Sequence, residues 1–167
     1  MRIGYGYDSH RFQEGRRLVL GGVEFPGETG LAGHSDADVL IHAIIDALLG
    51  AAALGDIGSH FPDTDPRWKD ADSTELLAQV VKEVRGAGYT VGNVDATVVC
   101  ERPKLRPKVD EIRARLSQLL NLSTSQLSIK GKTNEKLDDV GAGLGIEVHA
   151  VALLEPIAVD GNRQQSK

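Results

Sequence analysis

The sequence has a single cysteine, Cys100, so no disulfide bond can form within the chain. A lone free thiol fits a reducing compartment, and we predict a cytoplasmic location. Aromatic residues make up only 4% of the chain, so the core must be built from Ala, Val, Leu and Ile. The longest apolar run, 43–54, is interrupted by Asp46 and is shorter than the roughly 20 residues that span a membrane. The N-terminal segment MRIGYGYDSH also lacks the apolar stretch of a signal peptide.

The chain also lacks an excess of basic residues, because it has 19 Lys and Arg but 24 Asp and Glu, which gives a net charge of -5. This balance argues against nucleic acid as a partner, which would require a broad basic surface. A protein of this charge that binds phosphates must use local groups such as metal ions, helix N-termini and a few lysines. No P-loop or serine-hydrolase elbow is present, and the glycine-rich run 141–145 precedes a strand, which argues against a dinucleotide-binding motif.

The 167 residues are enough for one domain, which we place at 1–156, followed by a polar C-terminal tail at 157–167. Alternating and periodic apolar residues predict the secondary structure. Strands are predicted at 2–12, 17–20, 23–25, 89–100, 127–130 and 146–154, helices at 35–55, 72–86 and 107–121, and loops at 27–33, 56–69 and 133–145. This order predicts an α/β (α+β) sandwich, a mixed sheet with helices packed on one face. The last strand is largely apolar and has few charges, which indicates that both faces are covered, and the second cover could be another subunit.

Three residues are candidate metal ligands. Asp8 and His10 are two positions apart on a predicted strand and so share one face. His42 lies on an otherwise apolar helix, and Asp46, four residues later on the same helical face, could orient its ring. One aspartate and two histidines leave a tetrahedral zinc ion one open position, as in catalytic sites. The pattern alone also allows a surface pair and a core histidine that Asp46 satisfies.

Two segments could bind phosphate. A Gly-His-Ser stretch enters the helix for which Ser35 and the aspartate three residues later predict a capping box, so His34 and Ser35 would lie where a helix dipole attracts anions. Lys132 and Thr133 suit phosphate oxygens, and Glu135 suits a magnesium or manganese ion that bridges phosphates. An ordinary N-cap and a solvated charged turn remain open as alternatives.

Two further segments could hold the rest of a nucleotide-linked substrate. The proline-containing loop 101–106 leaves a strand and could present backbone groups to a base, although an exposed connector has the same pattern. Carboxylates at Asp56, Asp63 and Asp65 could accept hydroxyl groups of a sugar or diol.

Together these motifs resemble the 2-C-methyl-D-erythritol 2,4-cyclodiphosphate synthase family. The matching segments are RIGYGYDSHRF, AGHSDADVLIHAIIDALLGAAALGDIGSHFPDTDPRWK, GNVDATVV with ERPKLRPK, and KTNEKL. They extend over nearly the whole chain, and the long central segment is highly specific.

The resemblance implies conversion of 4-diphosphocytidyl-2-C-methyl-D-erythritol 2-phosphate to the cyclodiphosphate, with release of CMP, in the non-mevalonate isoprenoid pathway. It implies a homotrimer whose sheets face the trimer axis and whose active sites lie between subunits. It also implies Zn²⁺ on Asp8, His10 and His42, and Mg²⁺ or Mn²⁺ on Glu135 beside the substrate diphosphate.

The resemblance assigns the remaining site residues as well. His34 and Thr133 match the residues that steady the transition state. The expected substrate contacts are Ser35, Asp56, Ile57, Gly58, Phe61, Pro62, Asp63, Thr64, Asp65, Cys100, Glu101, Arg102, Pro103, Lys104, Leu105, Arg106, Lys132 and Asn134. Of these, Cys100 to Arg106 match the cytosine pocket.

The chain departs from the family pattern after Glu135. Many members have an aromatic residue and an arginine where this chain has Asp139 and Ala142. That arginine is associated with a cavity on the trimer axis that can hold an anionic isoprenoid, so we do not expect such binding here. Two other functions share the predicted site: a zinc-dependent phosphoester hydrolase and a non-catalytic cytidine-nucleotide-binding protein.

Overall fold

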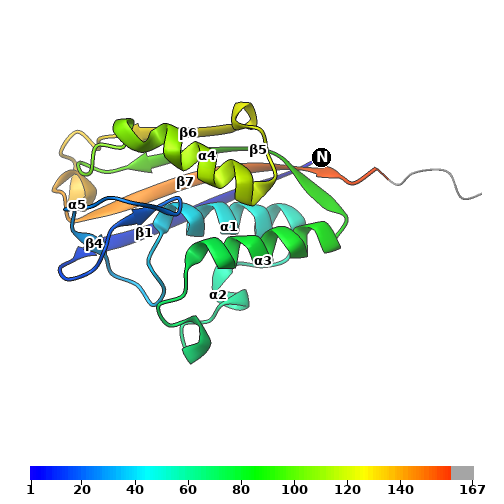
Figure 1. The fold of residues 1–167 in the computed structure, drawn as a ribbon, viewed down its shortest axis with the longest axis horizontal. Helices are drawn as coiled ribbons and strands as arrows, with labels where there is room; N and C mark the ends of the chain where they lie inside the picture. The colour runs from blue at the N-terminus through cyan, green and yellow to red at the C-terminus, as the bar shows by residue number, and fades with distance from the viewer. Residues whose placement is uncertain (159–167) are drawn as a thin grey trace, which may run out of the picture.

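The computed structural model describes residues 1–158 and contains a five-stranded mixed sheet with the strand order β4-β1-β7-β5-β6. The strands are β1 (Arg2–Gln13), β4 (Gly30–Leu31), β5 (Tyr89–Val99), β6 (Leu127–Lys132) and β7 (Gly145–Pro156), and β2 (Val19–Leu20) pairs separately with β3 (Val23–Glu24). The three long helices are α1 (Val39–Ala52), α3 (Ser73–Gly86) and α4 (Val109–Leu120). They lie on one side of the sheet, which confirms the predicted fold class (Figure 1).

Helix α1 packs directly on the backbone of β1. A Cβ atom added at Gly4 would lie 1.9 Å from the Ala47 carbonyl oxygen, and one added at Gly6 would lie 2.0 Å from that of Ala43. Glycines in the strand and alanines in the helix therefore permit a close approach that larger residues would prevent. This packing brings the helix face that carries His42 against the strand.

Helix α1 begins later than the sequence predicted. Its N-cap is Asp38, whose side chain accepts the backbone N–H of Ile41, and Ala37 before it has a φ of 59° that no helix allows. The predicted capping box with Ser35 at the N-cap is wrong, because Asp38 itself is the cap. Ser35 lies in the preceding loop, so the helix dipole does not explain anion binding there.

Three predicted loops contain short regular elements. Segment 27–33 contains β4, segment 56–69 contains α2 (Ile57–His60) and the 3₁₀ helix Pro66–Trp68, and segment 133–145 contains α5 (Asp138–Gly141). Aspartates cap two of these elements, since Asp56 accepts the N–H of Ser59 and Asp65 that of Arg67, and Asp138, the first residue of α5, accepts the N–H of Val140. Because local side-chain bonds hold these short elements, their sequences show no periodic pattern of apolar residues from which they could be predicted. Further 3₁₀ turns are Arg106–Lys108 and Thr124–Gln126.

Within residues 1–158, nothing covers the face of the sheet that points away from the helices. Ile3, Tyr5, Tyr7 and Val151 are 74%, 59%, 42% and 43% exposed, although they are large apolar or aromatic residues. The predicted cover by another subunit is treated below as a proposal. Of the predicted tail, residues 159–167 lie outside the described residues. Within residues 1–158, no helix combines the length and apolarity needed to cross a membrane.

Candidate functional site

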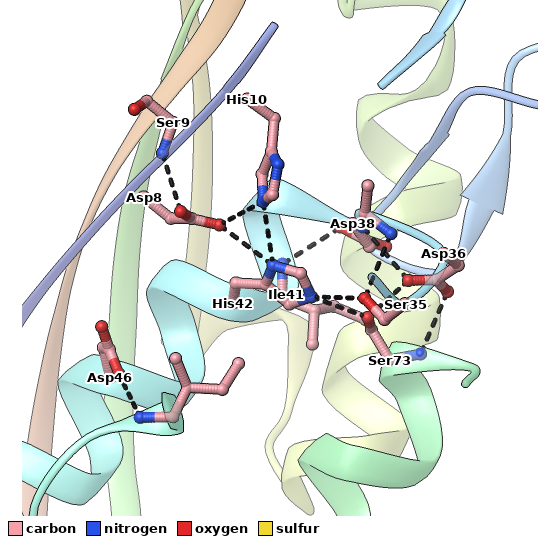
Figure 2. Close-up of polar contacts among 12 residues, drawn as sticks. Asp8, Ser9, His10, Ser35, Asp36, Asp38, Ile41, His42, Asp46 and Ser73 are labelled. Carbon is pink, nitrogen blue, oxygen red and sulfur yellow. Dashed lines mark hydrogen bonds and ion pairs between the residues drawn. The ribbon is translucent and has the colours of Figure 1, made fainter. Parts of the chain in front are cut away.

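Asp8, His10 and His42 converge as predicted (Figure 2). The Asp8 Oδ2 atom lies 3.0 Å from His10 Nε2 and 3.0 Å from His42 Nδ1, and the two nitrogens are 3.3 Å apart. Strand β1 presents two of these residues on its helix-facing side, and α1 presents the third. His42 is nearly buried, with 8% of its surface exposed.

The outer hydrogen bonds of the two rings show which atoms could bind a metal. His10 Nδ1 contacts the Ala32 carbonyl, which can only accept, so this nitrogen carries a proton and Nε2, which faces Asp8, is the ring atom that can bind a metal. His42 Nε2 lies 3.0 Å from Ser73 Oγ and 3.2 Å from Ser35 Oγ, so its Nδ1 is the atom directed at Asp8. Outer-shell bonds of this kind orient histidine ligands in metal sites.

The electrostatics of this cluster favour a cation. Burial raises the pKa of the Asp8 carboxyl, but hydrogen bonds from His10 and His42 outweigh burial and lower the pKa to about 2. Burial tends to lower the pKa of His10, yet the Asp8 carboxylate raises it overall. A carboxylate and two imidazole nitrogens at these separations are the donor set that a divalent transition metal prefers, so the residues fit the predicted zinc.

Asp46 does not orient His42, contrary to the prediction. Its Oδ1 atom accepts the backbone N–H of Ile57 at 2.8 Å, whereas the ring of His42 is held by Ser35 and Ser73. The helical spacing placed Asp46 on the correct face of α1, but its carboxylate points at the loop instead (Figure 2). It thereby fixes the predicted sugar-binding segment one helical turn beyond His42.

The loop before α1 brings Ser35 to the metal cluster, and His34 directly precedes it in the chain. Arg16 donates to the carbonyl oxygens of Gly33 and Ser35, which fixes the loop backbone. The Ser35 side chain contacts His42, as described above. His34 Nε2 is buried and has no hydrogen-bond partner among the described residues. A buried donor or acceptor without a partner is unfavourable, so this nitrogen is a candidate for a bond to a ligand.

The predicted sugar-binding residues are positioned in different ways. Phe61 is 7% exposed and packs edge-on against Trp68, with ring centroids 5.0 Å apart, so its side chain belongs to the core. Asp65 is paired with Arg67 at 2.6 Å. Asp63 and Thr64 are exposed at the tip of the segment.

A cavity of about 650 Å³ lies between β5, β6 and the start of α4. Its lining includes seven predicted residues: Cys100, Pro103, Lys104, Leu105, Arg106, Lys132 and Thr133. Sequence reasoning missed five others: Val109, Asp110, Ile129, Lys130 and Gly131. Burial raises the pKa of the Cys100 thiol to about 11, so this cysteine is a poor nucleophile and lines the wall instead.

The two predicted loops beside this cavity are linked to each other. Glu101 Oε1 accepts the backbone N–H of Asn134 at 3.0 Å, and Thr133 Oγ1 donates to Glu135 Oε1 at 2.5 Å. Glu101 and Asn134 therefore support the cavity without lining it. Arg102, which also does not line it, lies over the ring of Phe12 at 4.9 Å.

The metal cluster and the cavity lie on opposite halves of the sheet. The cluster is on β1 and α1, the cavity is on β6, and β7 and β5 separate these strands. Three inter-strand spacings of about 4.8 Å put the two strands roughly 14 Å apart. A site that uses both features must bridge this distance or combine features of two chains.

A family model described as the YgbB family matches residues 1–155. The chain belongs to the YgbB family. A 2-C-methyl-D-erythritol 2,4-cyclodiphosphate synthase of Gloeobacter violaceus is 60% identical over 155 residues, which cover 93% of this chain and 95% of that protein. The synthase of Salinibacter ruber is 57% identical over 155 residues, which cover 93% of this chain and 99% of that protein.

Solved structures show the same fold. A 2C-methyl-D-erythritol-2,4-cyclodiphosphate synthase in its CDP-bound form matches with a TM-score of 0.85 and 41% identity, and the match covers 92% of this chain and all of that one. The match includes both halves of the sheet. The family resemblance seen in the sequence motifs is thereby confirmed.

The segment after Glu135 departs from the pattern that the resemblance leads us to expect. Asp138, the first residue of α5, accepts the side-chain amide of Asn134 at 2.8 Å, so it supports the cavity loop. Asp139 and Ala142, where many family members have an aromatic residue and an arginine, are both exposed.

Proposed function

We propose that this chain converts 4-diphosphocytidyl-2-C-methyl-D-erythritol 2-phosphate to 2-C-methyl-D-erythritol 2,4-cyclodiphosphate and releases CMP. It is then a phosphorus-oxygen lyase of the non-mevalonate isoprenoid pathway, like its synthase relatives. The observation that carries this proposal is the convergence of Asp8, His10 and His42 in a chain that also has a nucleotide-sized cavity.

The metal ions are part of the proposal. Asp8, His10 and His42 would hold Zn²⁺, and Glu135 would hold Mg²⁺ or Mn²⁺ with the substrate diphosphate. Bound cations supply Lewis-acid charge and a template for phosphate oxygens. Glu135 is exposed at the end of the cavity loop, where a diphosphate could reach it.

The reaction requires little proton transfer by side chains of the protein. An oxygen of the 2-phosphate attacks the β-phosphorus, the bond between this phosphorus and the α-phosphate oxygen breaks, and CMP leaves. Because the second pKa of a phosphate monoester is about 6, the attacking oxygen is already anionic and no general base is required. His34 Nε2 would donate to phosphate oxygens whose charge changes during the step, and the Thr133 hydroxyl would do so once it turns away from Glu135 Oε1.

Binding and orientation of the substrate supply the remaining rate enhancement. The cavity holds the cytidine, with Lys132 and Thr133 at the phosphates, and segments 56–58 and 61–65 hold the erythritol or ribose. Ser35 donates to a phosphate oxygen beside the metal cluster. Holding both reacting groups of one molecule in line can contribute about 7–11 kcal/mol in the best cases.

The proposal includes a homotrimer, in which the uncovered face of the sheet points to the threefold axis. The exposed Ile3, Tyr5, Tyr7 and Val151 support it, because folded monomers rarely leave such a face in water. The separation of cavity and metal cluster supports a site in which one chain supplies the cavity and its neighbour the metal. Sedimentation analysis should give three times the monomer mass of 17.9 kDa. The cytoplasmic location stays a prediction.

Phosphorus NMR of the substrate incubated with the zinc- and magnesium-loaded protein tests the reaction. The lyase yields CMP and a cyclic diphosphate, which is the expected result. A linear monophosphate would identify a hydrolase instead. Tight CDP binding without any product would identify a nucleotide-binding protein, and both of these outcomes contradict the proposal.

A further inference from the structure

We infer that Ser73, held by Asp36, is a positioning residue that fixes the proton of His42 on Nε2 and so leaves Nδ1 available as a metal ligand. The inference rests on the proposed metal site and deepens it. Neither residue attracted attention in the sequence, because they are 37 positions apart and meet only in the fold.

A chain of short contacts leads from the loop before α1 to the metal cluster (Figure 2). Asp36 Oδ1 accepts the Ser73 hydroxyl at 2.5 Å, and Ser73 Oγ lies 3.0 Å from His42 Nε2. Asp36 is itself fixed, because Oδ2 accepts the backbone N–H of Ser73 at 3.0 Å and Oδ1 accepts that of Asp38 at 3.1 Å. Ser73 is fully buried, so water does not compete for its hydroxyl.

The direction of these bonds follows from the number of protons available. A carboxylate has no proton to give, so the single hydroxyl proton of Ser73 points at Asp36. The Ser73 oxygen can then only accept from His42, which requires a proton on Nε2. His42 Nδ1 faces Asp8 Oδ2 at 3.0 Å, so a proton on Nδ1 bonds to Asp8 and is the one that leaves when both atoms turn their electron pairs to a metal ion, whereas the Nε2 proton stays on Ser73.

Ser35 is affected in turn. Its Oγ atom lies 3.2 Å from His42 Nε2 and accepts the Ala37 backbone N–H at 3.2 Å. If His42 Nε2 lacked a proton, the Ser35 hydroxyl would donate to it. Because Ser73 keeps the proton on Nε2, the Ser35 hydroxyl proton stays available for a phosphate oxygen. One buried hydroxyl thus prepares both a metal ligand and a substrate donor.

The role of Ser73 is separable from the stability of helix α3. The N-cap of this helix is Asp72, whose side chain accepts the N–H of Thr74 at 2.8 Å without involving the Ser73 hydroxyl. Asp36 also keeps two backbone donors when the hydroxyl is removed. Ser73→Ala should therefore leave the cap in place and change mainly the ring of His42.

The first experiment uses the wild-type protein, so it does not depend on a variant that folds. Nitrogen-15 NMR at neutral pH, with and without zinc, reports which ring nitrogens of each histidine carry a proton. We expect a proton on His42 Nε2 in both states, whereas a proton that Nδ1 shares with Asp8 is lost when zinc binds. An Nε2 atom without a proton would overturn the inference whatever the zinc affinity.

The second experiment measures zinc affinity by competition with a chromogenic chelator. Loss of an outer-shell partner typically weakens metal binding about 10–100-fold, and we expect this for Ser73→Ala, together with a mixture of His42 tautomers. Ser73→Thr restores the hydroxyl and should recover most of the affinity. Ser35→Ala should have a much smaller effect on both readouts.

Ser117→Ala is the matched control, because Ser117 is also buried, lies on α4, and has a hydroxyl without a partner among the described residues. It should leave zinc affinity unchanged. Wild-type zinc affinity in Ser73→Ala, with the NMR signals of His42 unaltered, would contradict the inference but not the proposed function. Failure of the wild-type protein itself to bind zinc would contradict the proposed function, and the NMR result would still decide the tautomer.

Discussion

The two halves of the sheet hold their candidate functional groups in different ways. On the β1 side, the ligands come from a strand and a helix in direct contact, and a buried network behind His42 fixes its ring. On the β6 side, the cavity is walled by two loops, and its charged residues Lys104, Arg106 and Lys132 are exposed. The comparison indicates that the metal half is rigid before anything binds, whereas the nucleotide half can adapt.

The largest effect is expected where the rigid half loses a ligand. His42→Ala should lose bound zinc and lower the rate of cyclisation by more than about 100-fold, because even outer-shell changes cost up to that much. The chain should still fold, since the apolar residues of α1 remain buried. Metal content and circular dichroism check both points. His60→Ala, which removes a histidine from α2 that pairs with Glu83, should retain zinc; unchanged zinc in His42→Ala would defeat the assignment.

The rigidity itself can be tested at the contact between β1 and α1. Gly6→Ala forces a methyl group to within 2.0 Å of the Ala43 carbonyl oxygen, so the helix must move. We expect a loss of about 3 kcal/mol in the free energy of unfolding, measured with urea. Gly86→Ala is the control, because a Cβ there meets nothing within 4 Å. Equal stability of the two variants would mean that the close packing is not what fixes the metal half.

The sequence predicted this metal half well, and for a physical reason. An i, i+2 pair on a strand and an apolar helical period are local patterns, so Asp8, His10 and His42 could be placed on shared faces before their distance was known. The exposed apolar face of the sheet agrees with the largely apolar sequence of β7, which predicts cover on both faces. The order of strands and helices gave the fold class because each long element has its own period.

Sequence reasoning failed where contacts join distant or aperiodic segments. Asp46 lies on the predicted face of α1 but bonds to Ile57, because the loop after the helix returns to it. Ser73 reaches His42 only because α3 packs beside α1. The start of α1 was misplaced because serine and aspartate are both favourable N-cap residues, so Ser35 and Asp38 are distinguished only by the backbone at Ala37. None of these contacts leaves a periodic signal.

Acid should lower the free energy of unfolding of the metal-free protein through Asp8, in the metal half. The pKa of Asp8 is lowered to about 2 from 3.8, so its hydrogen bonds stabilise the fold above about pH 4, and this contribution is lost as the pH falls toward 2. The contribution is about 2 kcal/mol. The difference in unfolding free energy between wild type and Asp8→Asn should shrink over this window. The side chain of Asp110 is 98% exposed, so Asp110→Asn should differ from wild type in unfolding free energy by a small amount that does not change with pH.

A smaller effect is expected at the second metal position in the adaptable half. Glu135→Gln should keep its zinc and cyclise about tenfold more slowly at limiting magnesium, because an amide is a weaker ligand for a hard cation than a carboxylate. The magnesium dependence of the rate is the measurement. Glu111→Gln, on α4 and paired with Lys108, should match wild type. Wild-type magnesium dependence in Glu135→Gln would remove Glu135 from the metal site.

The smallest effect is expected at the cavity wall. Lys104 is exposed and lines the cavity, so its contact with a CDP phosphate would be screened by water. Lys104→Ala should raise the Kd for CDP about fivefold, equivalent to roughly 1 kcal/mol, and the difference should fall at high salt. Lys82→Ala removes the same charge from the exposed side of α3 and should leave the Kd unchanged.

This measurement bears directly on the contrast between the halves. An exposed lysine in an adaptable loop can be replaced in part by water or by its neighbours, so its loss has a modest cost that depends on salt. A loss of 100-fold in affinity that persisted at high salt would mean that Lys104 acts in a dry, preformed pocket. The nucleotide half would then be as rigid as the metal half, and the distinction between the two would have to be abandoned.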